Sequence, residues 1–79
     1  MKIRKTEING NETNIFIYEN KKEDYFVVSI PEIEWSIFFT YEEEKEPLLR
    51  KMSDSLSKAL SENESDEVAK RIYQWTREM

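Results

Sequence analysis

The residues of this chain best equipped for chemistry are carboxylates, and they gather in two runs. Four glutamates lie within residues 42–46, and four acidic residues lie within residues 62–67. Oxygen ligands of this kind suit calcium or magnesium when the backbone folds them around one point, usually at a glycine or asparagine turn. Near-consecutive glutamates mostly point apart into water, so both runs are interpreted as solvated surface. The alternative is a divalent-metal or hydrolytic site centred on Glu42–Glu46.

Other reactive side chains are scarce. The chain has no histidine and no cysteine, which removes the side chains that most often serve nucleophilic, acid–base and zinc chemistry. Its single glycine excludes a phosphate-binding loop, which needs several. A Ser–Lys pairing is conceivable on a helix carrying Lys51, Ser53, Ser55, Ser57 and Lys58, although these serines mostly occupy its polar side. We therefore predict no enzyme activity, no catalytic residue, no metal ligand and no cofactor.

Charge and hydropathy bear on partners and location. The net charge is −5, with five basic and seven acidic residues in 1–41 and seven basic and ten acidic residues in 42–79. A uniformly acidic domain is a poor ligand for nucleic acid, because that affinity depends on neutralising phosphates with Lys and Arg. The N-terminus is charged, and no apolar run approaches the roughly 20 residues of a membrane span. We expect one cytoplasmic domain over residues 1–79 that binds neither membrane nor nucleic acid.

The first half of the chain alternates with a period of two, which indicates strands. It predicts an antiparallel sheet over residues 1–41, with strands at 2–8, 15–18, 25–30 and 33–41 and turns at 9–14, 20–23 and 31–32. Ile3 and Ile8 fall on opposite faces of the first strand. The sheet is thus a meander of three or four strands.

The turns predict a register for this meander. Proline fits the second position of a tight turn, so Pro31-Glu32 is predicted as a two-residue loop. The resulting pairs are Ile30 with Ile33, Val28 with Trp35, and Phe26 with Ile37. A four-residue loop at 20–23 then pairs Ile17 with Phe26 and Ile15 with Val28. All these residues are apolar, so turn chemistry and hydrophobic pattern agree.

After Tyr41 the period becomes that of a helix. Thr40 and Glu43 have the spacing of a capping box, but Pro47 is tolerated only in a first helical turn, so the main helix is predicted to begin near Glu46. Ser65 is predicted to cap a second helix. Two apolar stripes follow, at Leu49, Met52, Leu56 and Leu60 and at Val68, Ile72, Trp75 and Met79. The fold class is α+β, in the order ββββαα, with a helical hairpin over 42–79 packed on one face of the sheet.

The second face of the predicted sheet is unexpectedly apolar. It would carry Phe16, Tyr18, Tyr25, Val27 and Phe38, with Tyr25 opposite Phe38 and Tyr18 opposite Tyr25. Such a face normally meets water, and aromatic residues are enriched at interface cores. We predict a non-enzymatic interaction module or homodimer that uses this face or an edge strand. The alternatives are ordinary cross-strand pairs shielded by lysine stems, and single-stranded nucleic-acid binding by stacking, which the net charge and Glu34 on this face oppose.

Three stretches resemble the YueH-like family of small proteins from Bacillus-type bacteria. They are Tyr18-Glu19-Asn20-Lys21-Lys22, Ile30-Pro31-Glu32-Ile33-Glu34-Trp35-Ser36 and Gln74-Trp75-Thr76-Arg77. The resemblance spans nearly the whole chain and includes no catalytic motif. It implies a bacterial, cytoplasmic protein and transfers no site residues.

Overall fold

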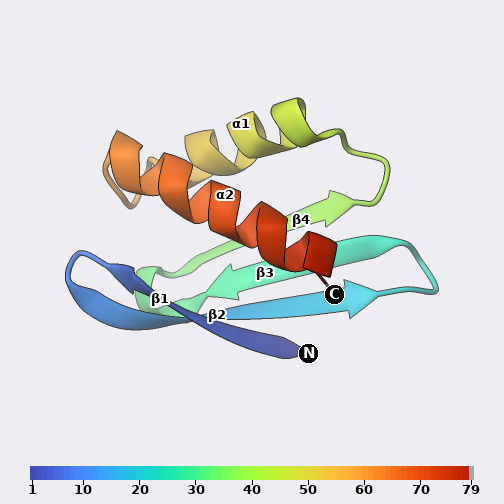
Figure 1. Cartoon of the computed structure of the whole chain (residues 1–79), viewed down its shortest axis with the longest axis horizontal. Coiled ribbons are helices and arrows are strands. Elements are labelled where there is room, and N and C mark those ends of the chain that lie inside the picture. The colour runs from blue at the N-terminus through green and yellow to red at the C-terminus, as the bar shows by residue number, and fades with distance from the viewer. Residues whose placement is uncertain (79) are drawn as a thin grey trace. The chain divides into compact units, whose positions relative to one another are not determined.

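The computed structural model describes residues 1–78 and divides the chain into two compact units, residues 1–42 and 43–79. The first unit contains four strands and the second contains two helices (Figure 1). The predicted α+β class and the order ββββαα are therefore confirmed.

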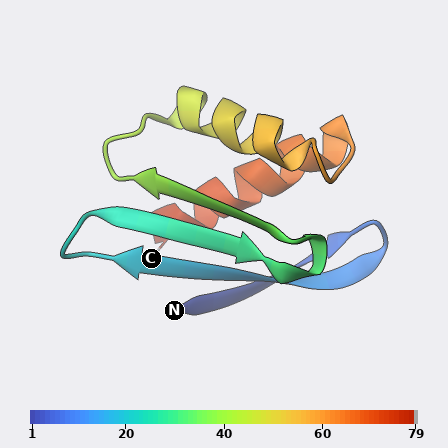
Figure 2. The ribbon, with the colours of Figure 1, turned by 180° about the vertical axis from the view of Figure 1, so that it is seen from behind.

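The strand unit is one antiparallel sheet in the order β1-β2-β3-β4, which confirms the meander (Figure 2). The strands are β1 (Lys2–Ile8), β2 (Asn11–Asn20), β3 (Tyr25–Ile30) and β4 (Trp35–Thr40). Consecutive strands are neighbours throughout, so β1 and β4 are the two edges of the sheet.

The first turn is shorter than predicted. Asn9 and Gly10 alone connect β1 to β2, with φ values of 53° and 79°, and Ile8 pairs with Asn11. Positive φ at both central residues is what a two-residue type I′ hairpin requires, and Asn-Gly supplies it at low cost. Residues 11–14, expected in the turn, therefore belong to β2.

The predicted register of the last hairpin was wrong. Pro31–Ile33 form a short 3₁₀ turn, and Glu34 follows in the left-handed region with its N–H donating to the Pro31 carbonyl over 3.0 Å. Because the connection holds two more residues than expected, Ile30 pairs with Trp35 rather than with Ile33. The observed partners of Val28 and Phe26 are Ile37 and Phe39.

The middle hairpin moved by the same amount. Its loop is residues 21–24, closed by a hydrogen bond from the Glu23 N–H to Asn20 Oδ1 (3.0 Å) and by a positive φ at Asp24. Ile17 therefore pairs with Val28 rather than with Phe26. Both shifts are by two residues, so the side chains of the paired strands keep the faces that the alternation assigned to them.

One face of the sheet is largely buried. Its central residues, Ile15, Ile17, Val28 and Ile30, have no solvent exposure. Ile8, Phe26, Trp35 and Phe39 are under 9% exposed, and Ile37 is half-buried. Phe26 stacks on Phe39 and packs against Tyr41, with ring centroids 5.3 Å apart in both pairs. We call this surface the core face.

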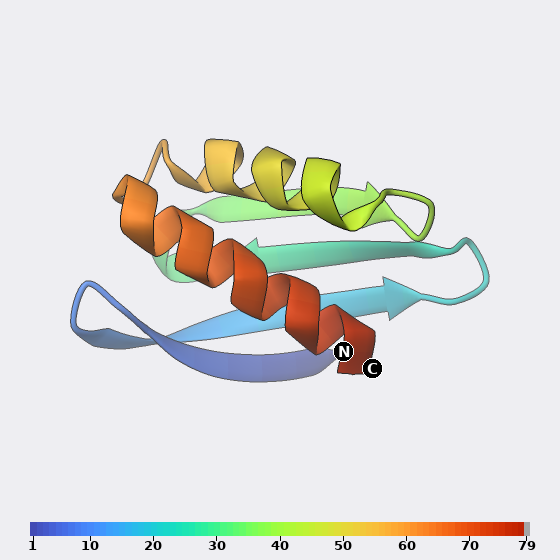
Figure 3. The same ribbon diagram turned by 45° about the horizontal axis from the view of Figure 1, so that its top comes forward.

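The second unit is a helical hairpin of α1 (Lys45–Leu56) and α2 (Glu62–Glu78), as predicted (Figure 3). Helix α1 begins within one residue of the predicted start, and Pro47 lies in its first turn. The predicted cap of α2, Ser65, was wrong. Glu44 is the N-cap of α1 and makes no side-chain cap bond, while the Glu64 N–H donates to Ser61 Oγ (3.3 Å) ahead of α2. Ser65 is fully buried within α2, and its hydroxyl has no hydrogen-bond partner among residues 1–78.

The buried helical residues follow the predicted stripes with small changes. Leu48, Met52 and Leu56 are buried in α1, whereas Leu49 is only half-buried. The buried residues of α2 are Ser65, Val68, Ala69, Ile72 and Thr76, while Trp75 is half-buried and Met79 lies outside the described residues. Within residues 1–78, neither helix has the length and hydropathy to cross a membrane.

Candidate interaction surface

The five residues predicted to form a contact surface lie on one face of the sheet. Tyr18 pairs with Val27, and Val27 pairs with Phe38, so these three side chains form a row across β2, β3 and β4. Alternation from this row places Phe16 and Tyr25 on the same side. We call this surface the open face. Phe38 is 52% exposed and Tyr18 40%, while Phe16, Tyr25 and Val27 are half-buried.

The aromatic rings of the open face touch one another, although not through the predicted pairs. Tyr25 pairs directly with Asn20 and Thr40, rather than with Tyr18 and Phe38. Its ring still lies 5.0 Å from that of Phe38 and 6.2 Å from that of Tyr18, because diagonal neighbours on a sheet are within reach of aromatic side chains. The Asn20 Nδ2 donates to the Tyr25 hydroxyl over 3.2 Å and fixes this ring at the edge of the group.

Sequence analysis missed one member of the surface. Ile3, on β1, pairs with Phe16 and is 56% exposed, the second-largest exposure among the large hydrophobic residues after Met1. The signal was available, because Ile3 and Ile8 were already assigned to opposite faces. What was missing was the length of β2, whose first four residues had been assigned to a turn.

The open face is uneven as well as apolar, because a row of large side chains lies beside a row that contains small ones. The row Tyr18–Val27–Phe38 carries two large rings, and the next row along the strands is Phe16–Ser29–Ser36. On β3 and β4 this second row is made of serines, of which Ser36 is exposed and Ser29 half-buried. We call the first row the ridge and the two serines the trough. Same-face neighbours along a strand are about 6.7 Å apart, so the ridge and the trough lie side by side.

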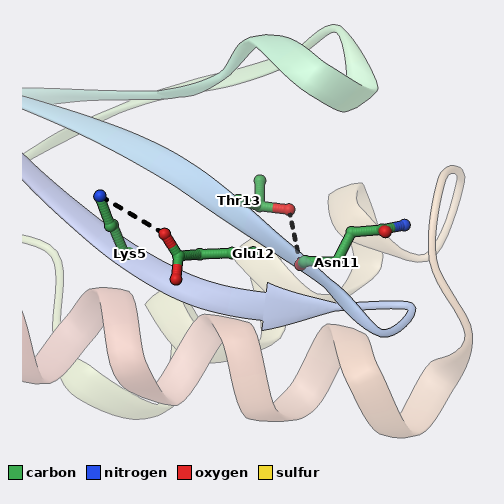
Figure 4. A network of polar contacts seen from close by, with 4 residues as sticks. All are labelled: Lys5, Asn11, Glu12 and Thr13. Atoms are coloured by element: carbon green, nitrogen blue, oxygen red, sulfur yellow. Dashed lines mark hydrogen bonds and ion pairs between the residues drawn. The ribbon is translucent and has the colours of Figure 1, made fainter.

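Charge is absent from the part of the open face that carries the rings. The open-face residues of β3, β4 and the second half of β2 are all uncharged: Phe16, Tyr18, Asn20, Tyr25, Val27, Ser29, Ser36, Phe38 and Thr40. The chain as a whole is 37% charged. Charged open-face residues occur at the β1–β2 hairpin end, where Lys5 Nζ lies 3.4 Å from Glu12 Oε1 (Figure 4). Glu34, predicted on this face, instead occupies the left-handed position before β4.

The carboxylates and serines considered for chemistry make local contacts. Glu43 accepts a hydrogen bond from Lys51 Nζ (3.1 Å), Ser53 donates to Asp66, and Ser57 donates to the Asp54 carbonyl (2.7 Å). Among residues 1–78, no three Asp or Glu side chains come together as they would around a metal ion. A groove of about 480 Å³ between α1 and α2 has charges of both signs on its wall, from Glu46, Arg50, Asp54, Glu62, Asp66 and Lys70.

One tyrosine has a perturbed acidity. The hydroxyl of Tyr41, just after β4, donates to the Glu19 carboxylate, and this hydrogen bond raises the pKa of Tyr41 to about 12. Desolvation and the negative charges of Glu19 and Asp24 act in the same direction. By strand parity Glu19 belongs to the core face, so this pair is separate from the open face.

Comparison with known proteins gives a consistent result. The model of a family described as YueH-like protein matches residues 2–78. A relative from Bacillus subtilis (strain 168), named "Uncharacterized protein YueH", is 40% identical over 82 aligned positions that cover all of both chains. No solved structure matches the chain.

Proposed function

This chain belongs to the YueH-like family, and we propose that it is a non-enzymatic protein-interaction module whose contact surface is the open face. The observation that carries the proposal is a half-exposed aromatic surface without charge on an otherwise highly charged chain. The cores of protein interfaces are depleted in charged residues and enriched in aromatic ones. Monomers seldom expose contiguous apolar patches beyond a few hundred Å². We expect the protein to act in the cytoplasm.

The exposed rings support binding to protein rather than to nucleic acid. Sheets that stack nucleic-acid bases on aromatics also need Lys or Arg along the path of the phosphates. The ringed part of the open face has no basic residue, and the chain has a net charge of −5. A nucleic acid would therefore meet a repulsive field with no local compensation. Metal binding at Glu42–Glu46 has no comparable structural support, because Glu43 already pairs with Lys51.

Photo-crosslinking in the native cells tests the proposal. A photoreactive phenylalanine analogue is placed at Phe38, and in a control strain at Asn63, which is exposed in the first turn of α2. We expect ultraviolet light to produce a discrete protein adduct from position 38 and not from position 63. Absence of any protein adduct at position 38, or the same adducts at both positions, would contradict an interface on the open face.

A further inference from the structure

We infer that the partner of the open face is a second copy of this chain, packed face to face with the ridge of each copy in the trough of the other. This inference rests on the proposed function and specifies its partner. Its basis is that the open face is complementary to itself in both shape and charge.

The shape argument follows from the two rows. Consider a two-fold axis that lies in the interface, parallel to the two rows and midway between them. This axis places each strand over the same strand of the second copy and places the ridge of one copy over the trough of the other. Phe38 of one copy then lies over Ser36 of the other, and Val27 lies over Ser29. On β2, Tyr18 lies against Phe16 of the second copy, which is an aromatic pair of the kind that stabilises interface cores. Each of the large exposed rings of the ridge thus meets a small residue or another ring.

The open face also avoids the electrostatic repulsion that often opposes self-association. In a two-fold interface the same patch appears on both sides, so a patch with a net charge would oppose its own sign. The ringed part of the open face has no charge, and its charged residues, Lys5, Glu7 and Glu12, lie at the β1–β2 hairpin end, outside the ridge and the trough. Two copies can therefore contact each other through this part of the face without like charges meeting, although each copy has a net charge of −5.

The area sets the strength of the contact. Strands about 4.8 Å apart with a rise of about 3.3 Å per residue give four strands of six residues a flat footprint of roughly 400 Å². Stable specific interfaces bury about 800 Å² per partner. A face of this size, matched by an identical face, supports a weak dimer with a dissociation constant of the order of 100 μM.

Sedimentation equilibrium of the purified chain between about 10 μM and 1 mM measures this dimer. We expect Phe38→Glu to weaken it at least about tenfold, because the charge would lie in a desolvated contact. Asn63→Glu adds the same charge to the helical unit and should leave it unchanged. Ser36→Tyr is the sharper variant, since it makes the face more apolar but fills the trough. If association were nonspecific and hydrophobic, Ser36→Tyr would strengthen it. If the ridge packs into the trough, Ser36→Tyr weakens association because the tyrosine occupies the trough.

A mixture of two variants tests the pairing itself. Phe38→Glu and Ser36→Lys should each dimerise poorly alone, and their equimolar mixture should recover association, because the new carboxylate and ammonium groups face each other across the two-fold. Circular dichroism of each variant confirms that it is folded. Failure of the mixture to recover association would overturn the ridge-into-trough pairing.

The remaining outcomes separate this inference from the proposed function. A wild-type chain that stays monomeric at 1 mM, together with a crosslink from position 38 to a different protein, would overturn the second copy and keep the interface. A monomer with no adduct would overturn both. A dimer insensitive to Phe38→Glu would place self-association elsewhere, for example at a sheet edge.

Discussion

The two faces of the sheet use alternate residues of the same strands and differ in the type of apolar residue. The core face is built around four aliphatic residues with no exposure, Ile15, Ile17, Val28 and Ile30. The open face relies on rings, two of them tyrosines, set among asparagines, serines and a threonine. Aliphatic side chains suit a surface that is largely shielded from water, whereas Tyr and small polar residues tolerate one that is exposed to it. This contrast fits a permanent core on one side and is the basis for proposing an exchangeable contact on the other.

The largest expected effect comes from truncating the core face. Ile17→Ala removes a side chain with no exposure from the centre of the sheet, so we expect the free energy of unfolding to fall by about 2–5 kcal/mol. Phe38→Ala, the matched truncation on the open face, should cost less than about 1 kcal/mol, because that ring is 52% exposed. Urea unfolding at a few micromolar, well below the expected dimer concentration, measures both. Equal losses for the two variants would show that the faces do not differ as described.

An intermediate effect is expected at the turn that sets which residues of β1 reach each face. Gly10 has a φ of +79°, and apart from its two chain neighbours no residue has an atom within 4 Å of where a Cβ would be, so Gly10→Ala introduces backbone strain without a clash. We expect a loss of about 1–2 kcal/mol in the free energy of unfolding. Asn9→Gly is the control, since glycine also accepts positive φ, and it should change stability far less. An alanine variant as stable as the wild type would contradict the type I′ assignment.

The sequence predicted which residues share a face more reliably than which residues touch. Hydrophobic alternation assigns parity, and both register errors were by two residues, which leaves parity intact. The error in the last hairpin arose at Pro31 and Glu34. Proline suggested a two-residue turn, but a left-handed, non-glycine Glu34 closes a longer one. Nothing local in the sequence favours glutamate in a left-handed conformation, so the length of this turn is determined by the pairing of β3 with β4.

The same limit applied to the contact surface. Its five predicted residues are on one face because that prediction needs parity alone. The ridge and the trough depend on register, since only the observed pairing of Ser29 with Ser36 brings the two small residues together. Ile3 was missed for a related reason, because a six-residue turn at 9–14 does not give the two-residue Asn9-Gly10 connection that pairs Ile3 with Phe16. The N-terminal cap of α2 was also predicted at the wrong serine. The capping oxygen belongs to Ser61, not Ser65, and the sequence did contain the signal, because Ser61 and Glu64 have the spacing of a capping box.

The smallest expected effect concerns the pH dependence of the core-face edge, where Tyr41 contacts Glu19 and Phe26. The pKa of Tyr41 is about 12 in the folded chain, compared with 10.0 for a tyrosine in the unfolded chain. The folded state therefore holds this proton more tightly. The Tyr41 contribution to stability is therefore intact below pH 10 and is lost as the pH rises from about 10 to about 12. Absorbance at alkaline pH should show one late-titrating tyrosine, which Tyr41→Phe removes. Tyr18→Phe, the matched change on the open face, should leave that late step in place. If the late step instead disappeared with Tyr18→Phe, the acidity would belong to the open face, and its rings would be less accessible to a partner than the structure indicates.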